Sequence, residues 1–242
     1  MAPESDGGPA PTRVPRVVPA GAELRWFSEA MQLWKRGPVM FAVIASAVVL
    51  VSVLGEPFPY AGFVASHLVA PLLATGLLFA SLAADRGDRP RAKHLVAVFA
   101  APATAQVAVV LGALVVFVAE AYAGWQVAGL NLFMPLPDAS GLSITAVLAI
   151  YGAGVVASLP VTFVPFAAVF DGEGIRRSFA LSVQAFAMNV PALGVFAACA
   201  FAMMMVAIMT MGIGLLLVLP WIAAASYAAW KDVFGLSGPV PR

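Results

Sequence analysis

The residues of this chain that could do chemistry are few and widely separated. His67 and Glu120 are ionisable residues inside long apolar segments, and burying a charge in lipid is costly enough to suggest a function. No second histidine or acid is placed as an obvious relay partner for His67, so we favour a neutral ring that hydrogen-bonds to a neighbouring helix. Glu120 could line a vestibule with His67, but we favour a carboxylate that reaches the outer membrane interface.

Other side chains give no stronger signal for catalysis or metal binding. Five of the ten Met residues lie between Met203 and Met211; thioethers bind Cu(I), but Met is also ordinary filler in apolar helices. The single cysteine, Cys199, lies in an apolar run, where we expect a small buried hydrophobe. The chain has no Walker loop, no Gly-x-Ser-x-Gly elbow and no His-Glu-x-x-His motif. We therefore predict no catalytic, cofactor-binding or metal-binding residue, and a protein that is not an enzyme.

Four polar residues are expected to form hydrogen bonds between helices instead of contacting a ligand. They are Gln106, Tyr151, Asn189 and Tyr227.

Composition identifies the solvent that surrounds these residues. The 242-residue chain is 62% hydrophobic and 10% charged, with a mean hydropathy of +0.96, whereas a soluble domain carries about 25% charged residues. A chain this apolar must face lipid over much of its surface. We predict an all-α polytopic bundle of six spans, with a tight hairpin at Gly212: Val39–Gly55, Ala61–Ala84, Ala103–Gly124, Ile144–Phe170, Pro191–Met211 and Ile213–Trp230.

The placement of the basic residues predicts the orientation of these spans. All 13 Lys and Arg residues lie before the first segment, between the second and third, between the fourth and fifth, or after the sixth. The intervening loops on the other side, including 125–142, carry none. Basic residues are retained on the cytoplasmic side, so we expect both termini to be cytoplasmic.

Three short amphipathic segments precede the pairs of spans, at 23–36, 90–100 and 172–189. In the first, Leu24, Phe27, Met31 and Trp34 share a face, and we expect this face at headgroup depth. In the third, Ile175, Phe179, Val183 and Phe186 do the same. The residues Phe27, Gln32 and Trp34 recur by type at the same spacing as Phe179, Gln184 and Phe186, which indicates an internal repeat.

The predicted domain organisation is a disordered cytoplasmic tail at 1–22, a membrane domain at 23–236 and a short tail at 237–242. The first tail is rich in Pro, Gly and Ala and lacks the apolar core of a signal peptide.

Several of these segments resemble a known group of proteins. The pair Trp26–Phe27, the run Arg177-Ser178-Phe179 before Pro191, and the ending Ser226–Gly235 resemble an uncharacterised family of bacterial six-span inner-membrane proteins. The pattern is more remotely similar to the membrane domain attached to some glycerophosphodiester phosphodiesterases. This resemblance implies a bacterial inner-membrane location. It carries over no activity, because catalysis in those enzymes belongs to a separate soluble domain.

The sequence therefore favours a non-enzymatic structural, accessory or lipid-interacting protein of the inner membrane. The alternative is a small-molecule or lipid transporter with a path near His67. The partners we expect are membrane lipids, with the basic cytoplasmic face toward anionic headgroups. Nucleic acid is not expected, because the basic residues are spread along a membrane face. Protein partners and the oligomeric state stay open.

Overall fold

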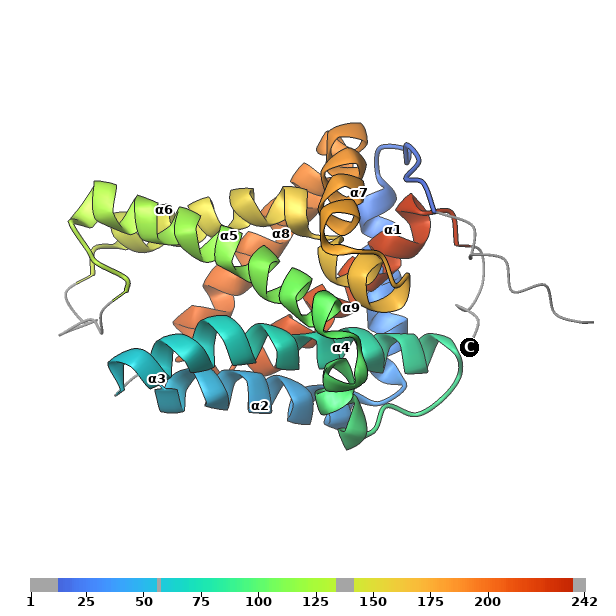
Figure 1. Ribbon diagram of the computed structural model, residues 1–242, viewed down its shortest axis with the longest axis horizontal. Helices are drawn as coiled ribbons and strands as arrows, with labels where there is room; N and C mark the ends of the chain where they lie inside the picture. The colour runs from blue at the N-terminus through green and yellow to red at the C-terminus, as the bar shows by residue number, and fades with distance from the viewer. Residues whose placement is uncertain (1–12, 56–57, 134–141, 237–242) are drawn as a thin grey trace, which may run out of the picture.

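A computed structural model describes residues 13–55, 58–133 and 142–236, so the predicted tail 237–242 and the first twelve residues lie outside the described part of the chain. Within these ranges all regular structure is helical. The longer helices run roughly along the longest axis of the molecule (Figure 1). They coincide with the six predicted apolar segments, as α2 (Pro38–Gly55), α3–η1–α4 (Pro59–Val64, Ala65–Val69, Ala70–Asp85), α5 (Ala103–Ala128), α6–η4–η5 (Ile144–Ser158, Leu159–Val161, Phe166–Phe170), α8 (Val190–Met209) and α9 (Leu215–Val233).

Within the described residues, fewer than six helices pass as membrane spans by length and composition. Four helical stretches are long and apolar enough to cross a membrane: Ala61–Asp85, Ala103–Ala128, Ile144–Phe170 and Val190–Met209. A fifth arises only if Ala22–Lys35 and Pro38–Leu54 are joined, and these two helices meet at 101°. The last helix, α9, has Pro220 inside it and Lys231 in its last turn, which lowers its apolar length. Six helical segments are present, but six spans are not established.

The predicted hairpin between α8 and α9 is confirmed. The turn places Gly212 at φ 82° and Met211 at φ 56°, and the hydroxyl of Thr210 accepts a hydrogen bond from the Gly214 amide at 2.8 Å. Met209 and Met211 leave 83% and 94% of their surface exposed here. Filling the core therefore does not account for these two methionines.

Three short helices lie across one end of the molecule: α1 (Ala22–Lys35), η2 (Ala92–Ala100) and α7 (Ile175–Met188). They match the three predicted amphipathic segments. The described ends of the chain, near Arg13 and Leu236, lie at this same end (Figure 1). We call it the polar end.

The residues of α1 that are buried against the protein lie outside the apolar set Leu24, Phe27, Met31 and Trp34, which was expected at headgroup depth. Trp26, Ala30 and Leu33 are buried, whereas Leu24 is 71% exposed. In α7 the buried residues are likewise Ser178, Leu181, Ser182 and Ala185, at the repeat spacing from those of α1. Small residues let helix backbones approach closely, and the larger Phe27, Phe179 and Phe186 are partly buried and pack against the core clusters.

The main hydrophobic core lies where α1 crosses α9. Trp26, Tyr227 and Trp230 are almost completely buried there, and Trp230 stacks on Phe166 with ring centroids 5.2 Å apart. Phe27 of α1 stacks on Phe196 at 5.3 Å and lies edge-to-face against Trp221 of α9 at 6.0 Å. This aromatic packing fixes α1 on α9 and so determines what lies between their polar faces.

Candidate functional site

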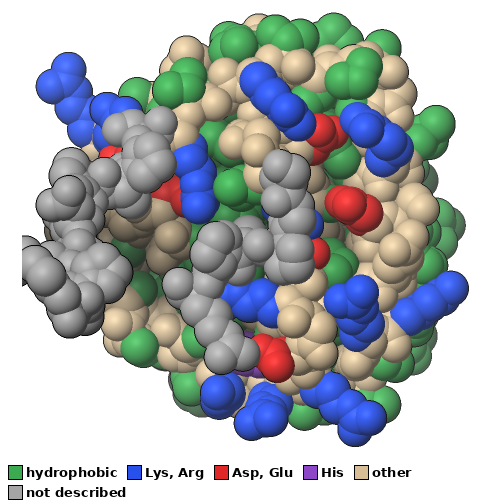
Figure 2. All heavy atoms as spheres, turned by 90° about the vertical axis from the view of Figure 1, so that its right-hand side faces the viewer, with side chains coloured by type: hydrophobic (Ala, Val, Ile, Leu, Met, Phe, Trp, Pro, Cys, Tyr) green, Lys and Arg blue, Asp and Glu red, His purple; other side chains and the backbone are tan. Residues whose placement is uncertain are grey.

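The charged side chains of the described residues gather at the polar end. Figure 2 shows Lys and Arg side chains around the rim of this face, with carboxylates between them. A pocket of about 470 Å³ opens there between α1 and α9. Its lining residues are Arg16, Arg25, Trp26, Ser28, Glu29, Ala228, Lys231, Asp232, Gly235 and Leu236.

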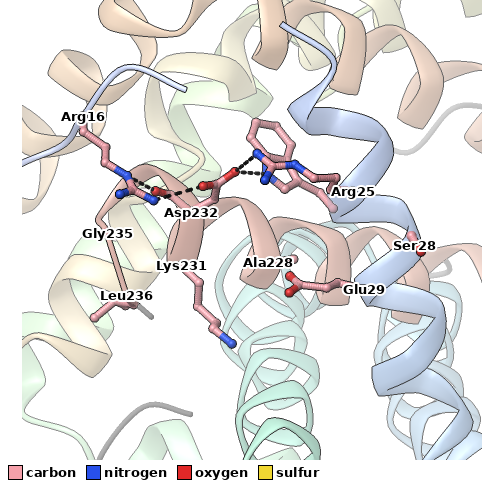
Figure 3. Close-up of a pocket in the computed structure, with 10 residues that line it drawn as sticks. Arg16, Arg25, Ser28, Glu29, Ala228, Lys231, Asp232, Gly235 and Leu236 are labelled. Atoms are coloured by element: carbon pink, nitrogen blue, oxygen red, sulfur yellow. Dashed lines mark hydrogen bonds and ion pairs between the residues drawn. The ribbon is translucent and has the colours of Figure 1, made fainter. Parts of the chain in front are cut away.

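Asp232 is the centre of the pocket's hydrogen-bond network. Its carboxylate accepts from the guanidinium of Arg16 at 3.2 Å, from that of Arg25 at 3.0 Å and from the Trp26 indole at 3.1 Å. Arg16 also donates through Nε to the Asp232 carbonyl at 2.8 Å. The two arginines therefore approach one carboxylate from opposite sides (Figure 3).

A second carboxylate, Asp85 at the end of α4, lies beneath the pocket. Lys231 Nζ donates to its two oxygens at 2.9 and 3.0 Å, and the Tyr227 hydroxyl donates at 3.0 Å. The side chains of Lys231 and Asp85 are only 12% and 14% exposed. Pairing at this depth neutralises Lys231, so the outward-facing positive charge of the pocket comes from the two arginines.

Glu29 differs from the other acids of the site. Its carboxylate extends from α1 over Ala228 (Figure 3). Arg25, one helical turn away, is bonded to Asp232 instead. Partial burial raises the pKa of Glu29 above its ordinary value, opposed by the nearby Lys231 and reinforced by Asp85. Glu29 is thus a carboxylate of the pocket that forms no hydrogen bond or ion pair with the described residues, although the charges of Lys231 and Arg25 act on it.

Residues 13–21, which we call the N-terminal strap, complete the site. The sequence assigns them to a disordered tail, but here they are held by specific contacts. The Arg16 amide donates to the Val233 carbonyl at 2.8 Å. Asn189, which is 2% exposed, accepts from the Val18 amide at 2.8 Å and donates to the Arg16 carbonyl at 2.9 Å.

The start of the strap is fixed by an ion pair. Arg13 pairs with Asp171, which follows η5, and its guanidinium lies 5.5 Å from the centre of the Trp230 ring. Burial raises the pKa of Asp171 to about 6, against the opposing effect of Arg13. Composition alone could not predict these contacts, because they join residues more than 150 positions apart.

His67 lies away from this site, inside the membrane segment. It occupies the π-helical turn η1, and its Nδ1 lies 3.2 Å from the Phe63 carbonyl of its own helix. Its ring contacts Phe117 at 3.9 Å and Phe63 at 4.8 Å between centroids. The expected hydrogen bond to a neighbouring helix is therefore replaced by one within the same helix.

Glu120 faces α6. A methyl group at Gly154 would overlap with its carboxyl group, so a glycine at this position makes room for the acid between the two helices. No described contact joins Glu120 to His67 within one constellation.

Two of the other polar residues predicted to bond between helices have clear outcomes. Tyr227 of α9 bonds to Asp85 of α4, as expected, whereas Asn189 bonds to the non-helical strap and to Ala185 of its own helix. Gln106 donates to two nearby carbonyls, that of Ala101 at 3.0 Å and that of Phe99 at 3.5 Å. Cys199 is exposed, contrary to the buried position expected from its apolar run.

The pocket residues Arg16, Arg25, Glu29 and Asp232 were not singled out by sequence. The available signal was the i, i+4 spacing of Arg25 and Glu29 on one helix. Among the described residues, no group of three or more His, Cys, Asp or Glu side chains is placed to hold a metal ion. No protein-family model, curated protein or solved structure matches this chain.

Proposed function

We propose that this chain is a non-enzymatic integral membrane protein whose polar end associates with lipid headgroups on the cytoplasmic side. The supporting observation is the concentration of basic side chains at one end of an otherwise apolar helical molecule (Figure 2). Juxtamembrane Lys and Arg residues are attracted to the negative surface of the cytoplasmic leaflet, by roughly 1 kcal/mol each. A protein of this kind would serve as a structural or accessory component.

In the proposed topology the six helical segments all span the bilayer, and α1, η2 and α7 lie on its cytoplasmic surface. The bacterial inner membrane and the resemblance to a six-span family are parts of this proposal. Reporter fusions placed before residue 13 and after residue 236 test the topology. Both should report a cytoplasmic location, and a periplasmic signal from either would overturn it.

The alternative of a transport path near His67 has less support. Its ring is packed against Phe63 and Phe117 and its hydrogen bond stays within its own helix. These contacts suit a structural residue.

Purification from the native membrane, with identification of co-purifying lipids and proteins, tests the proposed function. We expect anionic lipids to be enriched over their share of the bulk membrane. Arg89→Gln, just before η2, combined with Lys93→Gln, within η2, changes two exposed positions and should reduce that enrichment. The charge-preserving pair Arg89→Lys and Lys93→Arg is the control. Enrichment that is equal in both double variants would contradict the proposal.

A further inference from the structure

We propose that the pocket between α1 and α9 binds a phosphorylated primary amine, the chemical group that forms the headgroup of an ethanolamine phospholipid. The phosphate would lie against Arg16 and Arg25, and the ammonium against Glu29. This inference rests on the proposed function, since it names the ligand of the end that meets lipid headgroups.

The anion-binding half is formed by the two arginines. Their side chains are 59% and 63% exposed, whereas that of Asp232 between them is 20% exposed. A guanidinium carries five N–H donors. Arg25 uses NH2 on Asp232, and Arg16 uses Nε and NH2. One carboxylate neutralises only one of the two charges, so donors and net positive charge remain for a phosphate, which arginine binds bidentately.

The cation-binding half is Glu29. Side chains at i and i+4 on a helix lie about 5–6 Å apart at Cβ, and this spacing would allow Arg25 and Glu29 to pair. Instead, Arg25 is bonded to Asp232. Within the described part of the chain, the Glu29 carboxylate has no hydrogen-bond or ion-pair partner. A partly desolvated carboxylate without a partner is unfavourable, and an ammonium group would supply both charge and donors.

The chemistry of the two halves selects the ligand. A two-carbon linker keeps an ammonium within about one helical turn, roughly 5.4 Å, of its phosphate. A glycerol headgroup would present hydroxyls to Glu29 and leave its charge uncompensated, and a quaternary amine has no N–H to donate. Both should bind less tightly than a primary amine in the 470 Å³ pocket.

The test uses the full chain in detergent and titration calorimetry with glycerophosphoethanolamine, glycerophosphoglycerol and inorganic phosphate at pH 7.5. Wild-type protein should prefer glycerophosphoethanolamine. Glu29→Gln should lower the affinity for that ligand at least tenfold and change the affinity for phosphate less than twofold. Arg25→Gln should lower the affinity for both ligands. Glu29→Asp, which keeps the charge, should retain part of the preference even if the amide variant is poorly folded.

The matched control is Glu173→Gln, an acid at the same end that pairs with Arg177 at 3.1 Å and does not line the pocket. It should leave all three affinities unchanged. Nanodiscs containing ethanolamine or glycerol phospholipids identify the source of the ligand. Glu29-dependent thermal stabilisation only in ethanolamine nanodiscs indicates a lipid, and binding of the soluble compound alone indicates a free phosphoamine.

Equal affinity of wild type and Glu29→Gln for glycerophosphoethanolamine would overturn the inference. The inference would also be overturned if phosphate bound as tightly as the phosphoamine does, or if neither the soluble phosphoamine nor the ethanolamine lipid bound. If anionic lipids still co-purify in those cases, only the ligand of the pocket is wrong. If the pocket binds no phosphoamine and anionic lipids also fail to co-purify, the proposed function itself is overturned.

Discussion

The strap at residues 13–21 provides the most direct test of the structure, through Asn189→Ala. The Asn189 side chain holds the strap at its centre, by accepting from the Val18 amide and donating to the Arg16 carbonyl. Its third hydrogen bond, to the Ala185 carbonyl at 2.9 Å, fixes its rotamer from within α7. Truncation to alanine removes both links to the strap and leaves the strap's other contacts in place.

The expected magnitude follows from these two bonds. A hydrogen bond contributes about 1 kcal/mol net, so opening of the strap should become easier by about 2 kcal/mol. This is roughly a 30-fold increase in the open population, since 1.4 kcal/mol corresponds to a factor of ten. The remaining contacts, Arg13 with Asp171 and Arg16 with Asp232, should keep the global unfolding transition near its wild-type position.

Hydrogen exchange at the Arg16 amide, which is bonded to the Val233 carbonyl at 2.8 Å, measures this opening. Tryptic cleavage after Arg13 or Arg16 gives an independent reading. The control is Asn131→Ala, at an exposed position where, among the described residues, the side chain accepts from the nearby Phe133 amide. Exchange at Arg16 that stays within twofold of wild type in Asn189→Ala would refute the strap as described.

Three further outcomes are expected from thermal or chemical unfolding in detergent. Because burial raises the pKa of Asp171 from 3.8 to about 6, the folded state holds this proton more tightly than the unfolded state. Stability should therefore fall as pH rises from about 4 to about 6. Solvent screening limits the loss to about 1–2 kcal/mol, and an unchanged pH profile in Asp171→Asn would contradict this. Gly76→Ala would place a methyl 2.8 Å from Leu95 Cα and should cost about 1–3 kcal/mol. Gly152→Ala, where the added methyl would have nothing within 4 Å, should not lower stability. Equal losses of stability in the two variants would refute the close contact between Gly76 and Leu95. His67→Ala removes two ring contacts and should cost about 1–3 kcal/mol, with lipid co-purification unchanged; a loss of co-purification at normal protein level would favour a functional histidine.

The positions of the helices could be predicted from the sequence because lipid imposes strong requirements on length and composition. The apolar runs coincide with helices, and Gly212 lies in the turn between α8 and α9. Tyr227 was also expected to bond to another helix, since polar groups in an apolar chain need partners, whereas the bonds of Asn189 to the strap were not expected. The number of spans was less predictable, because α9 ends in charged residues that shorten its apolar part.

The packing of α1 could not be predicted in the same way. An amphipathic pattern identifies the most apolar face of α1, which was expected at headgroup depth, but it does not say which residues pack against the protein. In a membrane protein, however, lipid is as apolar as the core, so the large apolar face need not turn inward. Trp26, Ala30 and Leu33 face the protein because they fit closely against α9, whereas the more apolar Leu24 is 71% exposed.

The site itself had a signal in the sequence that hydropathy does not use. Asp85, Asp171 and Asp232 all lie at or next to the C-terminal end of a helical segment. The helix dipole disfavours negative charge at a C-terminus, so each acid there requires a cation from elsewhere in the chain. Lys231 supplies one for Asp85 and Arg13 supplies one for Asp171, while arginines of the strap and α1 supply Asp232. Acids at the C-terminal ends of helices, together with arginines in an apparently unstructured tail, thus predict that the tail binds to these helix ends. They do not predict which arginine pairs with which acid.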